Sequence, residues 1–495
     1  MKHEPHDPSH DRPKAPRQVV NRRTLLKSAV ILAGGAGAYG VAQNSSPAQA
    51  PNQSPTTLIR GGRVISMDPA IGDLDSGDVL IERGAISAVG RNLRAPNAQV
   101  VDASSKLVLP GFVDAHRHSW MSQFRALLVP TPWGEVIVQT LQRIYRPEDA
   151  YAGALLGAVE SLDAGITTMF EFGHTMFTDE FADAVLRGLQ ESSIRGVFGF
   201  ALPHLPVRPS AIEGARRAHE KHFSSVSPNQ LLTFAMACRA GNADLVETYG
   251  PEIGNPWENL LHDLRLGREL GAKRIHFHAV LVKPLFEAKL LGPDLCFVHP
   301  RRPGLESDED FKMVADSGGT FVITPATGQD DMSVQRFLQL GIPIGLGIDD
   351  GPGVRTDFFL PMKAMLWHDR TFERQRVRKE GGKPVLITHR EVLKAATIDG
   401  ARAVGLEDKI GSLTPGKRAD IILIDLDNLT YPRDRDPLPA VMSGAEVGDI
   451  SWVFVDGQVR KREGKLVGVD RKRARDVAQR SYDYLIQNVT LPANT

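Results

Sequence analysis

The chain has 495 residues, 42% of them hydrophobic, and Lys plus Arg balance Asp plus Glu at 59 each. This length can bury a large core and exceeds one ordinary domain, and the balanced charge gives no indication of a nucleic-acid partner. The two cysteines, Cys238 and Cys296, are far apart and form no CxxC pair, which argues against a disulfide framework or a cysteine metal site.

The first 50 residues differ from the rest of the chain. Asn21-Arg-Arg-Thr-Leu-Leu-Lys27 precedes an apolar stretch rich in Gly and Ala over 28–41, and Ala48-Gln-Ala50 supplies small residues for cleavage. This pattern resembles a twin-arginine signal peptide over 1–50 and predicts a periplasmic or extracellular mature protein. No apolar run in the mature chain approaches the roughly 18 residues that a membrane span needs.

Short strand patterns separated by glycine turns fill residues 51–109, and a similar pattern of short strands and turns occurs over 406–468. We predict that these two separated segments complete one small β-sandwich domain. A helical pattern over Arg471–Gln487 indicates that 469–495 form a C-terminal helix and tail.

Between the two β-segments, strand patterns alternate with helical ones such as Pro147–Leu162, Glu258–Leu270 and Asp308–Ala315. Eight such strands can be counted, and they end near residues 118, 172, 202, 238, 278, 299, 325 and 349. The alternation predicts an α/β fold with a TIM (β/α)8 barrel over 110–405, whose functional groups lie at the C-terminal strand ends.

The first of these strands ends in His116-Arg-His118. Histidines at i and i+2 of a strand face the same side, and neutral imidazoles are common ligands of zinc and similar metals. So short a motif also fits surface histidines, and its interpretation depends on the partners downstream.

Other histidines and acids also fall at predicted strand ends: His276, His278, His299, Asp349 and Asp350. In a closed barrel these ends converge on one mouth. Several imidazoles and one carboxylate suit one divalent metal, Zn²⁺ or Fe²⁺, with an open position for water. The metal would lower the pKa of that water toward about 7, and Asp349 could accept its proton.

Six motifs in this order carry a family resemblance: Pro110-Gly-Phe-Val-Asp-Ala-His-Arg-His118, Asp163-Ala-Gly-Ile-Thr-Thr168, His276-Phe-His278, Val298-His299, Leu346-Gly-Ile-Asp349 and Gly411-Ser-Leu-Thr-Pro-Gly-Lys-Arg-Ala-Asp420. Together they resemble the amidohydrolase superfamily, in the branch of cytosine, guanine and adenosylhomocysteine deaminases and triazine chlorohydrolases. The resemblance runs from about residue 57 to 468.

The resemblance implies that His116, His118, His278 and Asp349 bind the metal, and that His299 orients the water or polarises the substrate. It selects His278 over His276, whereas the strand pattern alone leaves both open. Binuclear relatives carry a bridging lysine on strand four, and Leu231–Cys238 contains none. We therefore expect a site with one metal ion.

The chain also departs from this branch. Its deaminases usually carry His-x-x-Glu on strand five, where the glutamate donates a proton to the substrate ring, but here the run is His278-Ala-Val-Leu281. A leucine side chain cannot transfer a proton. Strand seven is followed by Pro325-Ala-Thr-Gly328 in place of Pro-Thr-Ser-Asn. Both differences count against plain nucleobase deamination.

Four further residues follow predicted strand ends and are predicted to contact substrate: Trp120, His174, His204 and Arg239. Trp120 could stack on a flat substrate, although loop packing explains such an aromatic residue equally well.

We therefore predict an exported metal-dependent amidohydrolase, in which hydroxide on the metal attacks an sp² carbon of a small, cyclic C–N compound. The reaction would be amide or amidine hydrolysis or deamination. A lyase, decarboxylase or isomerase on the same barrel is the first alternative, and a non-catalytic binding protein is the second. The expected partner is a small-molecule substrate, without nucleic acid, and homo-oligomers remain open.

Overall fold

The computed structural model describes residues 56–125, 142–202, 209–225, 227, 230–239, 254–278, 282–300, 307–327, 334–350, 355–429 and 435–489. The predicted export signal over 1–50, His204 and Leu281 lie outside these residues.

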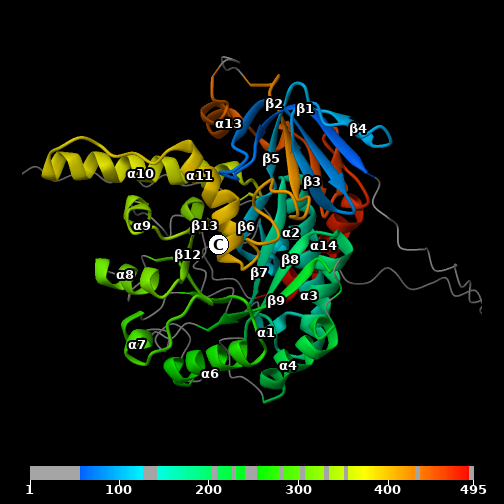
Figure 1. Cartoon of the computed structure of the whole chain (residues 1–495). Helices are drawn as coiled ribbons and strands as arrows, with labels where there is room; N and C mark the ends of the chain where they lie inside the picture. Colours follow the sequence, from blue (N-terminus) through cyan, green and yellow to red (C-terminus); the bar gives the residue numbers. More distant parts are fainter. Residues whose placement is uncertain are drawn as a thin grey trace, which may run out of the picture. The chain divides into compact units, whose positions relative to one another are not determined.

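Eight parallel strands form the barrel at the centre of the chain (Figure 1). The first seven are β6 (Phe112–His118), β7 (Ile166–Gly173), β8 (Arg195–Phe200), β9 (Leu232–Cys238), β10 (Ile275–His278), β11 (Leu295–Val298) and β12 (Thr320–Ile323). The eighth is divided into β13 (Ile344–Leu346), which pairs with β12, and β14 (Asp349–Asp350), which pairs with β6 and so joins the last strand to the first. The predicted TIM barrel is confirmed.

Helices alternate with these strands and cover the barrel: α1 (Gln142–Ile144), α2 (Pro147–Asp163), α3 (Asp179–Ser192), α4 (Pro209–Phe223), α6 (Pro256–Glu269), α7 (Val282–Glu287), α8 (Asp308–Asp316), α9 (Gln335–Gln339), α10 (Phe359–Glu380), α11 (His389–Ala396) and α12 (Ile398–Ala403). Side-chain caps explain where α6 and α8 begin. The Asn255 side chain accepts the first free N–H groups of α6, and Ser307 and Asp310 form a capping box at α8. Two short 3-10 segments, η1 (Ser119–Phe124) and η4 (Pro325–Thr327), follow β6 and β12.

The barrel interior is filled by small and apolar side chains from alternate strand positions, including Val113, Ala115, Phe170 and Phe172. Residues of α12 and the segment after it, such as Ala403 and Ile410, belong to the same cluster. This packed interior supports the groups at the C-terminal strand ends from below.

The second sheet combines an N-terminal and a C-terminal segment of the described chain, as predicted for the β-sandwich domain. Its N-terminal strands are β1 (Thr57–Ile65), β2 (Asp73–Glu82), β3 (Ala85–Gly90), β4 (Gln99–Asp102) and β5 (Lys106–Pro110). Its C-terminal strands are β15 (Ile421–Asp425), β16 (Ile450–Val455), β17 (Gln458–Arg462) and β18 (Lys465–Leu466), accompanied by α13 (Leu438–Gly444) and η5 (Val447–Asp449).

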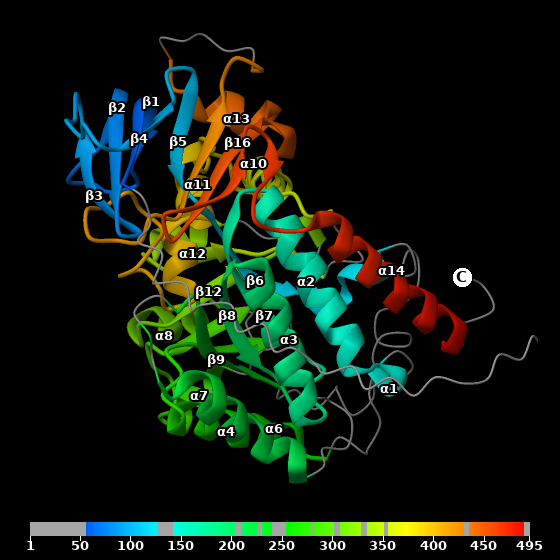
Figure 2. The ribbon, with the colours of Figure 1, turned by 90° about the vertical axis from the view of Figure 1, so that its right-hand side faces the viewer.

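The two chain segments meet where β5 pairs with β15 in antiparallel register. A buried ion pair links this sheet to the barrel, because Arg195 at the start of β8 donates to Asp420 at 2.7 and 2.9 Å. The last helix, α14 (Arg471–Asn488), packs against α2 and η1 (Figure 2).

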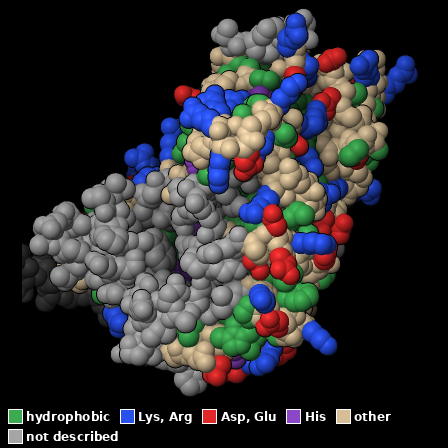
Figure 3. Space-filling model, turned by 90° about the vertical axis from the view of Figure 1, so that its left-hand side faces the viewer, with side chains coloured by type: hydrophobic (Ala, Val, Ile, Leu, Met, Phe, Trp, Pro, Cys, Tyr) green, Lys and Arg blue, Asp and Glu red, His purple; other side chains and the backbone are tan. Residues whose placement is uncertain are grey.

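Helix α10 extends away from the barrel and carries the basic run Arg370–Lys379 (Figure 1). Figure 3 shows Lys and Arg side chains gathered on the face toward which this helix points, and Arg374, Arg378 and Lys379 are exposed. Among the described residues, no helix is long and apolar enough to cross a membrane.

Candidate metal centre

A β-bulge near the end of β6 directs both predicted histidine ligands into the barrel. Asp114 pairs with Met169 and Arg117 with Glu171, so β6 advances three residues while β7 advances two. Val113 and Ala115 face the interior before the bulge, and the rings of His116 and His118 face it afterwards. Without the extra residue, strict alternation would turn both histidines outward.

His118 is held by a hydrogen bond that defines its tautomer. Its Nδ1 lies 2.8 Å from the carbonyl oxygen of Phe172, which can only accept, so Nδ1 carries the proton. In the neutral ring Nε2 then keeps its lone pair, and this atom faces Asp349 Oδ1 at 3.4 Å. A second hydrogen bond of this kind is typical of metal-binding histidines.

His116 and His278 meet at their Nε2 atoms, which are 3.0 Å apart. Burial lowers the pKa of His116 to about 3, and burial together with the neighbouring histidines lowers that of His278 well below its usual value. Both rings are therefore neutral near pH 7, the form that binds metal.

His276 lies two residues before His278 on the same strand but has a different partner. Its Nε2 donates to the carbonyl of Ala403 at 2.9 Å, and its ring stacks on Phe170 with centroids 3.7 Å apart. Both contacts belong to the packed interior below the mouth. The structure thus separates His276 from the converging group and leaves His278 in it.

Asp349 is the acidic member of the group and is 2% exposed. Its Oδ1 lies 3.4 Å from Nε2 of both His116 and His118, whereas its Oδ2 lies 3.6 Å from His299 Nε2. The backbone of Asp349 adopts φ 71° and that of His299 φ 57°, a strained region that is often found at functional sites.

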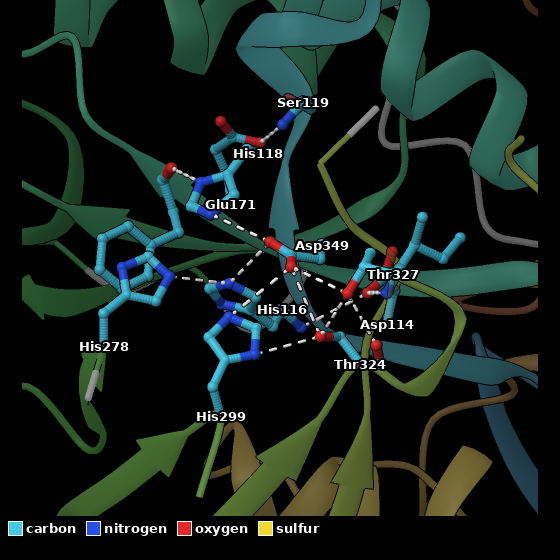
Figure 4. Close-up of polar contacts among 12 residues, drawn as sticks. Asp114, His116, His118, Ser119, Glu171, His278, His299, Thr324, Thr327 and Asp349 are labelled. Carbon is cyan, nitrogen blue, oxygen red and sulfur yellow. Dashed lines mark hydrogen bonds and ion pairs between the residues drawn. The ribbon is translucent and has the colours of Figure 1, made fainter. Parts of the chain in front are cut away.

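Two threonines after β12 complete the surroundings of Asp349 (Figure 4). The Thr324 hydroxyl lies 3.1 Å from His299 Nδ1 and 3.4 Å from Asp349 Oδ2, and Thr327 donates to the same carboxylate oxygen at 3.5 Å. Neither threonine was predicted as a site residue. Hydroxyl side chains after a strand are too common in sequences to single them out.

The donor set fits one divalent cation. The available ligand nitrogens of His116, His118 and His278 lie within 4.8 Å of one another, as do ligand atoms of His116, His299 and Asp349. Neutral imidazole nitrogens and a carboxylate oxygen that all face one point would repel one another without a cation. Figure 4 shows the four histidines and Asp349 pointing toward one another.

Behind β6 lies a second layer of polar groups that sequence reasoning missed. Arg117 is fully buried, with Nη1 3.6 Å from Asp114 Oδ2 and Nη2 donating to Thr356 at 2.8 Å. Thr356 donates in turn to Glu160 of α2 at 2.9 Å. Asp114 also accepts the N–H of Ile348 at 3.0 Å, which ties the first barrel strand to the last. The β-bulge that turns both Asp114 and Arg117 outward cannot be predicted from a single sequence.

Glu171 belongs to the same outer layer. Its side chain is buried and accepts the N–H of Ser119 at 3.0 Å, directly after His118. Burial raises the pKa of this carboxyl, while Ser119 and His118 act against the rise.

The predicted substrate contacts lie in different surroundings. His174 is close to the centre, since its ring stacks on His118 with centroids 4.7 Å apart. Trp120 is fully buried in η1 between Phe124 and Tyr145, and its ring lies 6.4 Å from that of His174. Its contact with substrate remains a prediction, and the structure places it as a support behind His174.

Arg239 follows β9 and is engaged by Asp263 of α6, to which its Nε and Nη2 donate at 2.9 and 2.8 Å. This bidentate pair holds the guanidinium in the wall of the barrel. A role in substrate binding stays a prediction for Arg239, and His204 lies outside the described residues.

Residues 107–250 and 312–460, more than half of the chain, match the amidohydrolase family. The chain belongs to this family. It is accordingly a metal-dependent hydrolase, as predicted, and proteins of this family bind a divalent metal.

The relatives of this amidohydrolase include deaminases. It is 28% identical to a 5-methylthioadenosine/S-adenosylhomocysteine deaminase of Pyrococcus furiosus, over 85% of this chain and 98% of that protein. It is 25% identical to a 5'-deoxyadenosine deaminase of Methanosarcina mazei, over 87% and 99% of the two chains.

Two solved structures share the fold. A zinc-bound adenosine deaminase from Xanthomonas campestris has a TM-score of 0.73 at 20% identity and covers 88% of this chain and 100% of its own. An atrazine chlorohydrolase from Arthrobacter aurescens TC1 complexed with zinc has a TM-score of 0.69 at 20% identity, over 86% and 100% of the chains.

Proposed function

We propose that this amidohydrolase cleaves a C–N bond at an sp² carbon of a small cyclic compound, using one divalent metal, Zn²⁺ or Fe²⁺, held by His116, His118, His278 and Asp349. The observation that supports the proposal most directly is the convergence of three imidazole nitrogens and one carboxylate at the C-terminal end of the barrel. A metal at this position supplies Lewis acidity, which lowers the pKa of water and polarises the bond under attack.

The two oxygens of Asp349 suit two tasks. Oδ1 faces the ligand histidines, whereas Oδ2 faces His299 and accepts hydrogen bonds from the threonine hydroxyls. We assign metal binding to Oδ1 and proton transfer to Oδ2, which takes a proton from the attacking water and returns it to the leaving nitrogen. His299 Nε2 lies beside this oxygen and would stabilise the charge that develops on the substrate.

The relatives' names point to amino groups on adenine nucleosides, and an amino-substituted heterocycle is therefore the first substrate class to test. Leu281 stands where deaminases of this branch carry their proton-donating glutamate. We therefore expect either that another group protonates the substrate ring, or that the leaving group departs without ring protonation.

The ring of His174 stacks on that of His118 beside the metal centre, and we expect this aromatic surrounding to favour a planar substrate. Export through the twin-arginine route remains part of the proposal and rests on the sequence of residues 1–50.

The experiment is a substrate screen with metal-loaded protein against adenine nucleosides, amides, lactams, amidines and halogenated heterocycles, with ammonia release as one readout. For any substrate found, His116→Ala should lose both metal and turnover. Asp349→Asn should lower turnover by at least about a hundredfold, since general acid–base catalysis typically contributes this much. Full activity of both variants would refute the proposal.

Incubation in ¹⁸O-labelled water separates hydrolysis from the lyase, decarboxylase or isomerase alternative. Hydrolysis places the label in the product at the carbon that lost nitrogen. A product without label would reject hydrolysis and support the alternative.

A further inference from the structure

Helix α10 extends from the barrel and keeps only one of its faces covered (Figure 1). The buried side chains of this helix run from Phe359 to Glu373 and lie on its inner face. Farther along, the chain that follows α10 folds back over the same face, because the N–H groups of Val385 and Ile387 donate to Glu373 at 2.8 Å and to Asp369 at 2.9 Å. The outer face is therefore the one that a partner could reach.

This outer face carries a continuous stripe of four cations and one tryptophan. The five residues follow one another at spacings of four, three, four and four: Lys363, Trp367, Arg370, Arg374 and Arg378. Side chains at these spacings lie above one another on one side of a helix. Trp367 is 57% exposed, and Arg374 and Arg378 are also exposed. At 1.5 Å per residue the stripe is about 22 Å long.

The charge of the stripe is not neutralised by the protein itself. Among the described residues, no acidic side chain forms an ion pair with Arg370, Arg374 or Arg378, whereas Arg376 on the inner face pairs with Glu373 at 2.8 Å. The formal net charge of the whole chain is zero, so the stripe is a local concentration of positive charge. Such a field attracts an anionic partner. It also disfavours a second copy of the same stripe, since like charges would then face each other.

Trp367 indicates which anionic partner fits. An exposed indole combines an apolar ring with a polar N–H, and tryptophan is enriched where membranes meet water. A straight stripe on an outward face also suits a partner that is flat along its whole length. We propose that α10 docks this protein on a membrane surface that contains anionic phospholipids, with Trp367 at the level of the headgroups and Arg374 and Arg378 at their phosphates. The contact is peripheral and requires no membrane-spanning helix.

The test is co-sedimentation of the full chain with vesicles of phosphatidylglycerol and phosphatidylcholine, beside vesicles of phosphatidylcholine alone. We expect tighter binding to the anionic vesicles. The variant Arg370→Gln/Arg374→Gln/Arg378→Gln should bind them roughly a hundredfold more weakly, because each cation at an anionic membrane contributes about a fivefold factor in affinity.

The matched control removes as many exposed cations from α14, as Lys472→Gln/Arg475→Gln/Arg480→Gln, and should bind like the native protein. Because every variant carries the full chain, the basic residues of 1–50 contribute equally to each measurement.

The position of Trp367 is tested by tryptophan fluorescence on vesicles that contain brominated phosphatidylglycerol, which quenches indoles in contact with the lipid. We expect quenching in the native protein and its loss in Trp367→Phe, although the other tryptophans of the chain remain. Equal quenching in both proteins would overturn the proposal.

Three other results would also overturn it. The first is equal affinity of the arginine variant and the native protein for anionic vesicles. The second is binding of duplex DNA as tight as that of the vesicles, which would show a general polyanion site. The third is a native protein that is dimeric without vesicles while the arginine variant is monomeric, which would identify a second copy as the partner of this face.

Discussion

Asp114 and Arg117 face the same side of β6 although they are three residues apart, and their side chains approach to 3.6 Å behind the metal centre. Regular alternation would place them on opposite faces, and the β-bulge between them removes that difference. The same extra residue turns His116 and His118 into the barrel. The outer ion pair and the inner ligands are therefore two consequences of one irregularity.

Replacing Arg117 tests the outer layer. Arg117→Met leaves Asp114 buried without its cation, and we expect the free energy of unfolding to fall by roughly 3 kcal/mol. Urea denaturation measures the change. The double variant Arg117→Met/Asp114→Asn should recover part of the loss, and a double variant that is no more stable than the single one would show that the pair does not act as a unit.

Gly347 should be required for the position of His116. A Cβ at Gly347 would lie 2.8 Å from both Cβ and the carbonyl oxygen of His116, closer than carbon atoms tolerate. We expect Gly347→Ala to displace the His116 ring and lower the metal content of the purified protein. Gly448→Ala is the control, because nothing lies within 4 Å of its added Cβ. Equal metal content in both variants would contradict this role.

Thr324 should act as a positioning residue for His299 and Asp349. Thr324→Val keeps the shape of the side chain but removes the hydroxyl that contacts both groups. We expect turnover to fall by about 10- to 100-fold while the metal remains bound, a usual range for supporting residues of metal sites. Thr324→Ser should restore most of the activity, and a serine variant as poor as the valine variant would point to packing instead.

The pH dependence of stability tests the pair between Arg239 and Asp263. Burial opposes ionisation of Asp263, but hydrogen bonds from His262 and Arg239 hold its pKa below the usual 3.8. A carboxyl with a lowered folded-state pKa contributes stability above its unfolded pKa and loses it as pH falls. We expect Asp263→Asn to cost roughly 3 kcal/mol at pH 7, because a buried guanidinium loses its partner.

The difference in unfolding free energy between the wild-type protein and Asp263→Asn should shrink as the pH falls below about 4, where the Asp263 carboxyl of the unfolded wild-type chain becomes protonated. Urea denaturation of both proteins at pH 7, 5 and 3 measures it. A difference that stays constant over this range would show that Asp263 does not act through its charge.

Much of this architecture was predictable because it has a periodic signal. Each of the eight strand patterns coincides with an observed strand, and helices predicted over Pro147–Leu162 and Arg471–Gln487 agree with α2 and α14 within a residue. The β-sandwich followed from short strands at both ends of the chain. These features repeat along the sequence, and burial of one face imposes the repeat.

The features of the site that could not be predicted from the sequence each depend on one local irregularity of the backbone or one side-chain contact. Only the register of β6 against β7 shows how the bulge aims His116 and His118. In the structure, contacts with Ala403 and Phe170 separate His276 from His278, which are equivalent by strand period. The complete burial of Trp120 depends on the packing of η1 against α2, which its position after a strand does not reveal.

The central claim is that one divalent ion is bound by His116, His118, His278 and Asp349. Its most direct test is the metal content per chain of His278→Ala, measured by inductively coupled plasma mass spectrometry beside the native protein and His276→Ala. We predict one ion per chain in the native protein, loss of the ion in His278→Ala and retention in His276→Ala, whose histidine donates to Ala403. Two ions in the native protein, or full metal content in His278→Ala, would contradict the account.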